Sequence, residues 1–278
     1  MLASPLAACL TLCAALAAGT WILSLLTREY SWVDRVWSIA PPVYVGIHAA
    51  WAGFADLRLD LLLALTTLWG ARLTFNYARK GGYAPGGEDY RWAVLRDKLG
   101  PVAFQALNAT FISPFQNVLI LLIALPAAVC AANPAPLGPA DLALAAAFLA
   151  LLAGETVADQ QQWRFHRAKR ERAARGEPEP LGFLDEGLWA WSRHPNFCCE
   201  VAQWWVVYGF AVAAGGGWLN WSLTGAVLLT ALFDGSTRFT ESITAAKYPA
   251  YAAYQQRVGR ILPLRWPSAR AAGSRRLG

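Results

Sequence analysis

The sequence predicts an all-α protein, a multi-pass transmembrane helical bundle of about seven spans. Apolar residues make up 56% of the 278 residues, and charged residues make up only 15%. Apolar segments of roughly 20 residues, the length that crosses a bilayer, recur along the chain. Lys and Arg are concentrated in alternate connections between these segments. Together these observations place most of the chain in a membrane.

Seven segments are apolar enough to be spans. They lie at about 5–26, 36–54, 57–78, 111–132, 139–160, 197–214 and 218–235. The first resembles a signal peptide, but no positive residue precedes it and Arg28 follows it, which favours a retained span. The third is the weakest, because Arg58, Asp60 and Arg72 lie within it and charges are costly inside a bilayer.

Positive charge orients the predicted bundle. One set of connections holds 22 of the 24 Lys and Arg. These connections are 27–35, 79–110, 161–195 and the tail 236–278. The opposite set, near 55–56, 133–138 and 215–217, holds none, so the N-terminus is expected outside and the C-terminus in the cytoplasm. The cytoplasmic loops also explain the net charge of +6 by attraction to membrane lipids, and no nucleic acid partner is expected.

The chain shows no sign of a soluble domain. Residues 1–265 are expected to form a single seven-helix membrane domain, with an interfacial tail helix at 236–260 in which aromatic residues alternate with Arg and Lys. Residues 266–278, rich in Ala, Arg and Gly, are expected to be disordered. The five Cys and three His lack metal-ligand spacing, so no metal site is expected. The oligomeric state does not follow from the sequence.

Polar residues inside the predicted spans form four groups at helical spacing, each near a cytoplasmic end. The groups are Arg72, Asn76 and Arg79; Glu155, Asp159 and His166; Asn196, Glu200 and Gln203; and Asp234, Arg238 and Glu241. Such spacing places the members of a group on one helix face, and ionisable groups in membranes usually face a cavity or one another. We therefore expect one polar chamber open to the cytoplasm. The alternative is that the acids only pair with Arg164 or Arg193, that Arg72 snorkels to the headgroups and that His166 is solvated.

Residues 186–200 carry the most functional information. They place Arg193, His194, Asn196 and Glu200, together with two Trp, directly before an apolar segment. Arg binds phosphate or carboxylate, and Trp offers faces for stacking. Pro195 would begin a helix whose first N–H groups favour anions. This pattern predicts a site for an anionic, ring-bearing ligand, although interfacial Trp and cytoplasmic Arg are also ordinary at the end of a span.

A family resemblance rests on this stretch. Gly187-Leu188-Trp189, Ser192-Arg193-His194-Pro195-Asn196-Phe197 and Glu200 resemble the motif of steroid 5-alpha-reductase-like membrane proteins. The match is closer to bacterial proteins that resemble the 3-oxo-5-alpha-steroid 4-dehydrogenase C-terminal domain. Weaker matches run in order from Ser31-Trp32-Val33-Asp34 to Pro263. Cys198-Cys199 departs from the usual aliphatic or aromatic residue and Gly, and a Cys side chain there would crowd a close ligand.

The resemblance implies a reductase in a bacterial inner (cell) membrane. It would bind NADPH from the cytoplasm and reduce an activated C=C bond of a lipophilic steroid-, isoprenoid- or enone-like substrate. The residues expected at the cofactor are Glu155, Asp159, His166, Arg193, His194, Asn196, Glu200 and Arg238. Asp159, Asn196 and Glu200 follow from position in the motif, whereas Arg238 is a basic group suited to phosphate. The candidate acids, placed by depth alone, are Tyr77, Tyr90 and Asp34.

Two other functions remain open from the sequence. Isoprenylcysteine carboxyl methyltransferases, which use S-adenosylmethionine, resemble the same half of the chain. They normally lack an acid at the position of Glu200, which favours reduction. The third class is a non-catalytic lipid-binding membrane protein. The identity of the substrate is beyond the sequence, because bilayer-facing cavities depend on packing.

Overall fold

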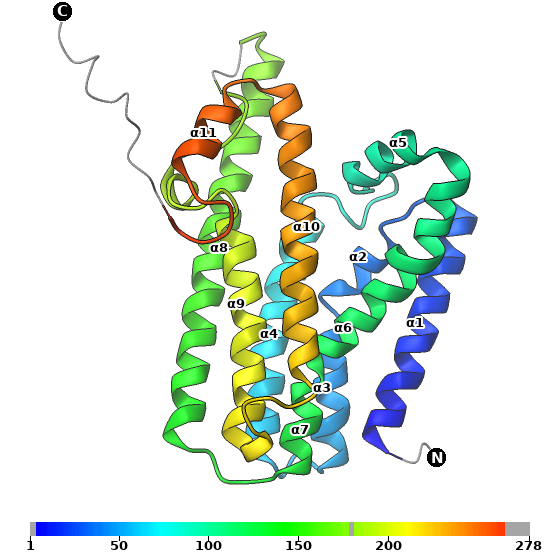
Figure 1. The fold of residues 1–278 in the computed structure, drawn as a ribbon, viewed down its shortest axis with the longest axis vertical. Coiled ribbons are helices and arrows are strands. Elements are labelled where there is room, and N and C mark those ends of the chain that lie inside the picture. Colours follow the sequence, from blue (N-terminus) through cyan, green and yellow to red (C-terminus); the bar gives the residue numbers. More distant parts are fainter. Residues whose placement is uncertain (1–3, 178–180, 265–278) are drawn as a thin grey trace, which may run out of the picture. The chain divides into compact units, whose positions relative to one another are not determined.

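A computed structural model describes residues 4–177 and 181–264. Helices account for 78% of the described residues, in which the pairing of Ser192 with Gly259 is an isolated bridge. Four helical stretches are long and apolar enough to cross a membrane: Pro5–Thr27, Tyr90–Ala132, Pro139–Ala174 and Pro195–Gly216. The predicted all-α membrane protein is therefore confirmed (Figure 1), while the count of seven spans stays a prediction.

The chain divides into two compact units. Unit 1 comprises Met1–Leu149 and Gln203–Thr230, and unit 2 comprises Ala150–Ala202 and Ala231–Gly278. Three helices contribute residues to both units: α8 (Pro139–Ala174), α9 (Pro195–Ala211) and α10 (Leu223–Lys247). All the predicted cofactor residues belong to unit 2, and all three candidate acids belong to unit 1.

Unit 1 contains the N-terminal helices. In chain order they are α1 (Pro5–Thr27), α2 (Trp32–Trp37), α3 (Ala40–Trp51), α4 (Leu57–Arg79), α5 (Tyr90–Leu107), the π-helix η1 (Asn108–Phe115), α6 (Gln116–Ala124) and α7 (Pro126–Ala132). Side-chain caps begin two of the long helices. Ser4 Oγ accepts a hydrogen bond from the Ala7 amide at 3.1 Å, and the Asp56 carboxylate accepts one from the Arg58 amide at 2.9 Å.

The segment predicted as one span at 36–54 contains two helices. α2 ends at Trp37 and α3 begins at Ala40. Pro41 and Pro42 lack amide hydrogens, so they are tolerated in the first turn of a helix but interrupt its interior. The two prolines thus explain why a new helix begins here.

A buried ion pair explains how α4 carries charge within an apolar segment. Arg58 Nε donates to Asp141 Oδ1 at 2.7 Å, and a second guanidinium nitrogen donates to Asp141 Oδ2 at 2.9 Å. The two residues are only 2% and 1% exposed. Asp141 Oδ2 also accepts from the Gly138 amide at 2.8 Å, which ties the start of α8 to the same pair. The third predicted span is therefore helical despite its charges.

The core of unit 1 is aromatic and closely packed. Trp69 of α4 and Trp204 of α9 meet edge to face with ring centroids 4.8 Å apart, and each is at most 1% exposed. A Cβ atom on Gly225 of α10 would lie 2.3 Å from the Leu122 carbonyl oxygen. The absence of a side chain at Gly225 therefore permits α10 to approach α6 within unit 1.

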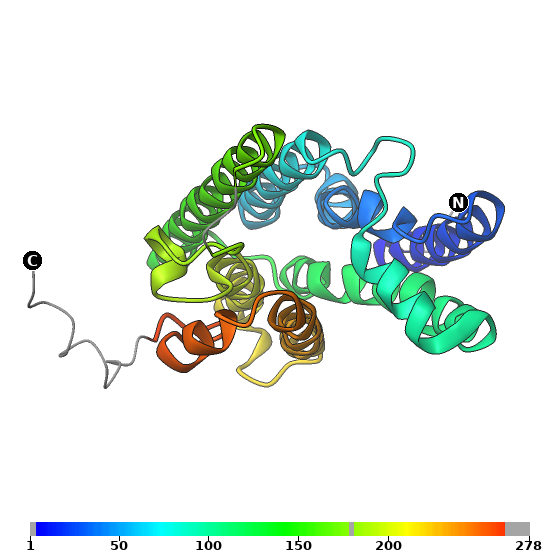
Figure 2. The same cartoon turned by 90° about the horizontal axis from the view of Figure 1, so that it is seen from above.

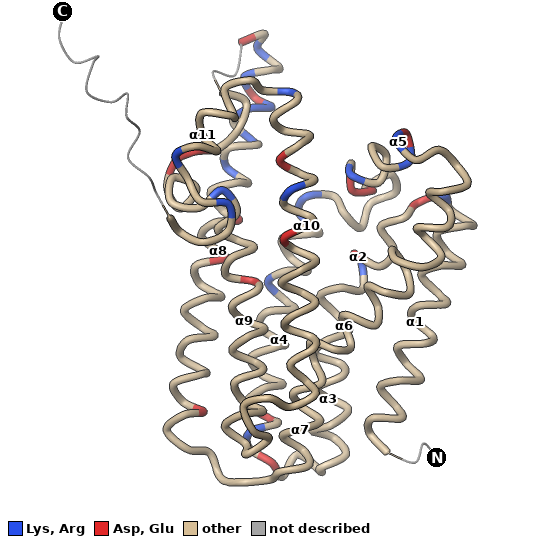
Figure 3. The backbone as a smooth tube through the Cα atoms, in the orientation of Figure 1, with Lys and Arg blue, Asp and Glu red and all other residues tan. Residues whose placement is uncertain are grey.

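Unit 2 contains the rest of α8, η2 (Gly187–Ala190), the start of α9, the end of α10, and α11 (Tyr251–Arg257). α8 and α10 carry most of their charged residues in their unit 2 parts (Figure 3). An aromatic cluster packs Phe183 against Tyr251, Tyr254 and Val258. The Phe183 ring lies 5.4 Å from the Tyr254 ring in a stacked arrangement. This cluster holds the segment after α8 against α11.

The predicted tail helix at 236–260 was wrong in its bounds. α10 continues without a break to Lys247, and α11 is a separate short helix that lies beside it (Figures 1 and 2). Pro249 disfavours a helical conformation at Tyr248, so the chain turns between the two helices. The predicted disorder of 266–278 concerns residues outside those that the structure describes.

Candidate functional site

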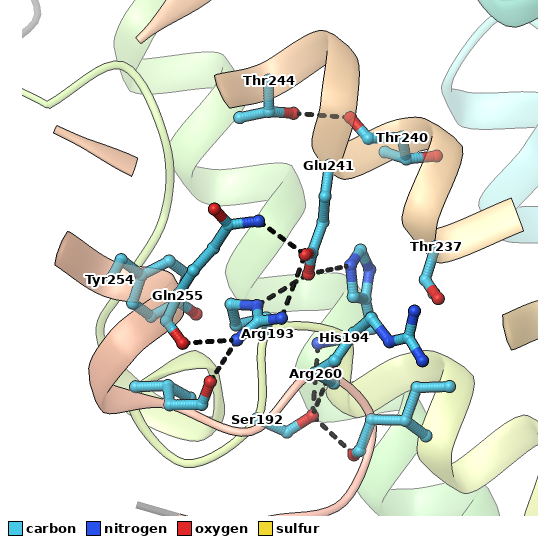
Figure 4. A network of polar contacts seen from close by, with 12 residues as sticks. Ser192, Arg193, His194, Thr237, Thr240, Glu241, Thr244, Tyr254, Gln255 and Arg260 are labelled. Atoms are coloured by element: carbon cyan, nitrogen blue, oxygen red, sulfur yellow. Dashed lines mark hydrogen bonds and ion pairs between the residues drawn. The ribbon is translucent and has the colours of Figure 1, made fainter. Parts of the chain in front are cut away.

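The Glu241 carboxylate lies at the centre of a buried polar network in unit 2 (Figure 4). Arg193 Nε donates to Glu241 Oε1 at 2.7 Å, and Arg193 Nη2 donates to Oε2 at 3.0 Å. His194 Nε2 lies 3.0 Å from Oε1, and Gln255 Nε2 donates to Oε2 at 2.9 Å. None of the three residues Arg193, His194 and Glu241 is more than 9% exposed. The carboxylate therefore connects α10 with the segment before α9 and with α11.

The chain after α11 packs along the segment that precedes α9. Ser192 and Gly259 form a parallel bridge, in which the Arg193 amide donates to the Gly259 carbonyl at 2.9 Å. Ser192 Oγ donates to the Ile261 carbonyl at 2.7 Å, and the Tyr254 hydroxyl donates to the Trp189 carbonyl. The motif residues at 192–194 are thus held by backbone contacts as well as by side chains.

A carboxylate and an amide from two helices meet next to this network. Asn196 Nδ2, in the first turn of α9, donates to Asp159 Oδ1 of α8 at 3.3 Å. Glu155, Asp159 and Glu200 are each no more than 4% exposed. Asn196 Oδ1 is buried and accepts no hydrogen bond from any residue that the structure describes. This oxygen can accept a hydrogen bond from a ligand N–H or O–H group.

Cys199 is accommodated by a glycine on the neighbouring helix. A Cβ atom on Gly154 of α8 would lie 3.2 Å from Cys199 Sγ. A glycine at 154 therefore leaves room for the sulfur where the resembling proteins have a glycine on α9. The Cys199 side chain therefore lies against α8 at Gly154.

A shallow pocket of about 400 Å³ opens beside the network. Its lining residues are Arg193, Arg238, Glu241, Ser242, Ala245, Gln255 and Arg260. Arg238 Nε donates to Asp234 Oδ2 at 2.8 Å, and Arg260 donates to the other oxygen of the same carboxylate. Two Arg thus share one acid, which leaves a positive charge at the rim of the pocket.

The structure does not bring His166 to this pocket. His166 lies on the exposed end of α8, with its ring edge to face with Phe165 at 5.4 Å. Of the seven remaining predicted cofactor residues, Glu155 and Glu200 are buried, and the other five fall into two sets. Arg193, His194 and Arg238 lie at the Glu241 network and the pocket, while Asp159 and Asn196 are hydrogen-bonded to each other.

Asp34 and Tyr77 lie close together in unit 1. Trp92 Nε1 donates to Asp34 Oδ2 at 3.3 Å, and the Asp34 charge acts on the Tyr77 phenol. Burial raises the pKa of Asp34, and the Asp89 carboxylate raises it further, against hydrogen bonds from Ser31 and Trp92 that lower it. The Tyr77 hydroxyl is buried and has no hydrogen-bond partner among the described residues. These two groups can hold or donate a proton.

Tyr90 does not join this pair, because its side chain is 54% exposed. The loop before it is held by Glu29 and Arg35. Glu29 Oε1 accepts from the Gly86 amide at 2.8 Å, while Glu29 Oε2 accepts from Arg35 at 2.6 Å. Arg35 Nε in turn donates to the Gly82 carbonyl at 3.1 Å. The loop that follows Tyr77 is therefore ordered by contacts with the segment that contains Asp34.

Sequence reasoning missed the contributions of the last helix and the chain after it. Gln255, Arg260 and Ser192 contact the network or line the pocket, yet none of them was a predicted site residue. Glu241 stood in a polar group on α10 but was not assigned to the site. Two signals were available: its spacing from Asp234, seven residues away on the same helix face, and its place among the weaker matches of the family resemblance.

The Glu241 network predicts a pH-dependent stability. Burial alone would raise the pKa of Glu241, but hydrogen bonds from His194, Arg193 and Gln255 outweigh it and lower the pKa from 4.5 to about 2. A depressed carboxyl pKa stabilises the fold above pH 4.5, here by about 3 kcal/mol, and this contribution is lost as the pH falls towards 2. We expect the difference in unfolding midpoint between the wild type and Glu241→Gln to be constant above pH 5 and to shrink below pH 4.5. A difference that does not change between pH 7 and pH 2.5 would contradict the network.

Comparison with known proteins covers both units. A family model described as "Protein of unknown function (DUF1295)" matches residues 20–258, which include every predicted site residue. The chain is 37% identical over 259 residues to a Schizosaccharomyces pombe protein named "Uncharacterized protein C594.04c". That alignment covers 87% of this chain and 75% of the yeast protein. No solved structure matches the chain at a significant level.

Proposed function

Because the chain belongs to the DUF1295 family, which is associated with steroid 5-alpha-reductase-like proteins, we propose that it is an NADPH-dependent membrane reductase. The substrate class is a lipophilic molecule with an activated C=C bond, such as a steroid-, isoprenoid- or enone-like lipid. NADPH, when bound, supplies the hydride for such a reduction. The residues of unit 2 bind and orient this cofactor.

The observation that carries the proposal is the orphaned oxygen of Asn196. Asn196 Nδ2 donates a hydrogen bond to the Asp159 carboxylate. The buried Asn196 Oδ1 accepts no hydrogen bond from the described residues. A buried acceptor without a donor is costly unless a ligand supplies one. A carboxamide N–H or a ribose hydroxyl of NADPH fits this oxygen, and the buried acids Asp159 and Glu200 suit further hydroxyl or amide donors.

The basic rim suits the phosphates of the same cofactor. Arg238 and Arg260 share the Asp234 carboxylate, so the rim keeps a positive charge that phosphate would neutralise. Arg193 contributes less directly, because its guanidinium already donates to Glu241 and to the Gln255 carbonyl. Its proposed role is to shape the site.

The acid of the proposed reaction is Asp34. Reduction of an enone leaves negative charge on an oxygen, and a nearby acid stabilises or protonates it. A carboxyl with a raised pKa retains its proton at a higher pH than usual, which suits this task. Tyr77, with its unpartnered hydroxyl, is the second donor of the proposed pair.

The proposed topology has seven spans with the N-terminus outside and the C-terminus in the cytoplasm. Its support is the absence of Lys and Arg from alternate connections and the apolar length of the helices. This topology places the unit 2 residues of the Arg-rich connection 161–195 on the cytoplasmic side, where NADPH is available. The bacterial cell membrane is proposed from the closer resemblance to bacterial proteins.

Ligand-induced stabilisation tests the proposed function directly. The purified protein is heated with NADPH, with NADH and with S-adenosylmethionine, and the unfolding midpoint is recorded. NADPH at 100 times its dissociation constant is expected to stabilise the protein by about 2.7 kcal/mol. Stabilisation by S-adenosylmethionine alone would reject the reductase proposal, and stabilisation by none of the three would favour a non-catalytic lipid-binding protein.

Glu200→Gln tests the cofactor site within this function. Removal of a buried charge that accepts hydrogen bonds costs roughly 1.5–3 kcal/mol, so NADPH affinity is expected to fall about 10- to 100-fold. Binding is measured by quenching of Trp fluorescence. Glu171→Gln, an exposed acid of α8, is the matched control and should bind NADPH like the wild type. Unchanged affinity in Glu200→Gln would remove Glu200 from the site.

A further inference from the structure

We propose that Glu241 is a positioning residue, which fixes the orientation of the first turn of α9 through Arg193 and His194. Its relevance to ligand binding rests on the proposed function, whereas its effect on α9 does not. The two motif residues adjoin Pro195, where α9 begins, and Asn196 follows directly. A single residue, Pro195, therefore separates Asn196 from His194, which contacts Glu241.

The hydrogen bonds of the Glu241 carboxylate fix its orientation. Two parallel hydrogen bonds from Arg193, at 2.7 and 3.0 Å, fix the plane of the carboxylate relative to the guanidinium. His194 Nε2 approaches the Oε1 atom at 3.0 Å, and Gln255 donates to Oε2. Each carboxylate oxygen therefore has two partners, and rotation of the group would break at least two contacts.

The backbone of the same segment makes further hydrogen bonds, which connect it to α9. The Arg193 amide donates to Gly259, and the His194 amide donates to Ser192 Oγ at 3.2 Å. The His194 carbonyl accepts from the Cys198 amide at 3.0 Å, which is the first hydrogen bond that joins this segment to α9. With its backbone and its side chain both held, His194 transmits the position of Glu241 to α9.

Attachment of the C-terminal segment does not by itself require this network. The aromatic cluster of Phe183, Tyr251 and Tyr254 already holds α11, and Tyr254 donates to Trp189. Buried ion pairs recover little net stability because desolvation offsets their attraction, and their best-attested use is to fix one arrangement. The contact between His194 and Glu241 does not involve α11. It constrains His194, which directly precedes the first residue of α9.

Hydrogen–deuterium exchange without any ligand tests this inference. In Glu241→Gln, amide exchange in peptides covering 196–202 is expected to become at least tenfold faster than in the wild type. Glu171→Gln, the same change at an exposed acid of α8 outside the pocket, is the matched control and should exchange like the wild type. Faster exchange confined to residues 251–261 would overturn the proposal, because Glu241 would then only attach the C-terminal segment.

His194→Ala gives the same test if Glu241→Gln does not fold. It removes one contact of the carboxylate and leaves the Arg193 pair in place, so a smaller rise in exchange over 196–202 is expected. Unchanged exchange in these peptides would overturn the proposal.

A measurement of NADPH binding by Glu241→Gln and by the wild type separates this inference from the proposed function. A displaced Asn196 would lose its hydrogen bond to the ligand, so Glu241→Gln is expected to weaken NADPH binding roughly 2- to 10-fold. If the wild type does not bind NADPH but Glu241→Gln still exchanges faster over 196–202, the positioning role is upheld. The proposed cofactor is then rejected. If Glu241→Gln binds NADPH as tightly as the wild type does, and its amides over 196–202 exchange at the wild-type rate, the positioning role is rejected. The proposed function is then unaffected.

Discussion

Asp34→Asn is expected to slow reduction of an enone substrate by roughly 10²- to 10⁴-fold, the usual contribution of a general acid. The substitution removes the proton that Asp34 would give to the oxygen of the substrate. Because the pKa of Asp34 is raised, the wild-type rate should fall as the pH rises through that pKa. The variant should lack this fall. Both are measured by NADPH oxidation across a pH series.

Stability and cofactor binding serve as controls for this prediction. A carboxyl with a raised pKa destabilises the fold as the pH rises through its titration, so a neutral Asn should not lower stability at pH 7. Asn can still accept the hydrogen bond from Trp92. NADPH affinity should also be unchanged, since the cofactor is assigned to residues of unit 2. A variant that turns over at the wild-type rate would exclude Asp34 as the acid and leave Tyr77.

Arg58→Ala is expected to destabilise the protein by roughly 3–5 kcal/mol, the cost of leaving a buried charge without its partner. Asp141 would lose two charge-assisted hydrogen bonds while remaining almost fully buried. The resulting loss of stability is measured as a lower unfolding midpoint in detergent. No direct effect on NADPH affinity is expected, because both residues belong to unit 1.

A paired replacement is the control for the ion pair. Arg58→Met combined with Asp141→Leu removes both charges at once and is expected to recover most of the lost stability. A double variant as unstable as Arg58→Ala would show that the cost lies in packing or in the cap on Gly138, to which Asp141 contributes.

Much of the helical architecture could be predicted because apolar length and charge distribution act locally along the chain. The predicted first span at 5–26 corresponds to α1, and the third at 57–78 corresponds to α4. The bounds were less predictable where proline interrupts a long apolar or amphipathic segment. Pro41 and Pro42 accompany the start of a separate α3, and Pro249 accompanies the end of α10.

The candidate site was only partly predictable. The helical spacing of Glu155 and Asp159 identified a buried acidic face on α8, and the motif pointed to Asn196. The same reasoning placed Arg193 at the cofactor but did not predict the acceptors in unit 2 to which all three of its guanidinium nitrogens donate. Spacing along a helix shows which face a residue occupies, but not which residue of another segment it meets.

The sequence by itself determined that this is an all-α membrane protein of the DUF1295 family, because composition, span length and family motifs are properties of the linear chain. Only the tertiary structure decided which polar groups become partners. Arg193 and Glu241 are 48 residues apart in the chain, and Arg58 and Asp141 are 83 apart. Such pairs form because burial makes an unpartnered charge costly, and the packing of distant helices selects the group that compensates it.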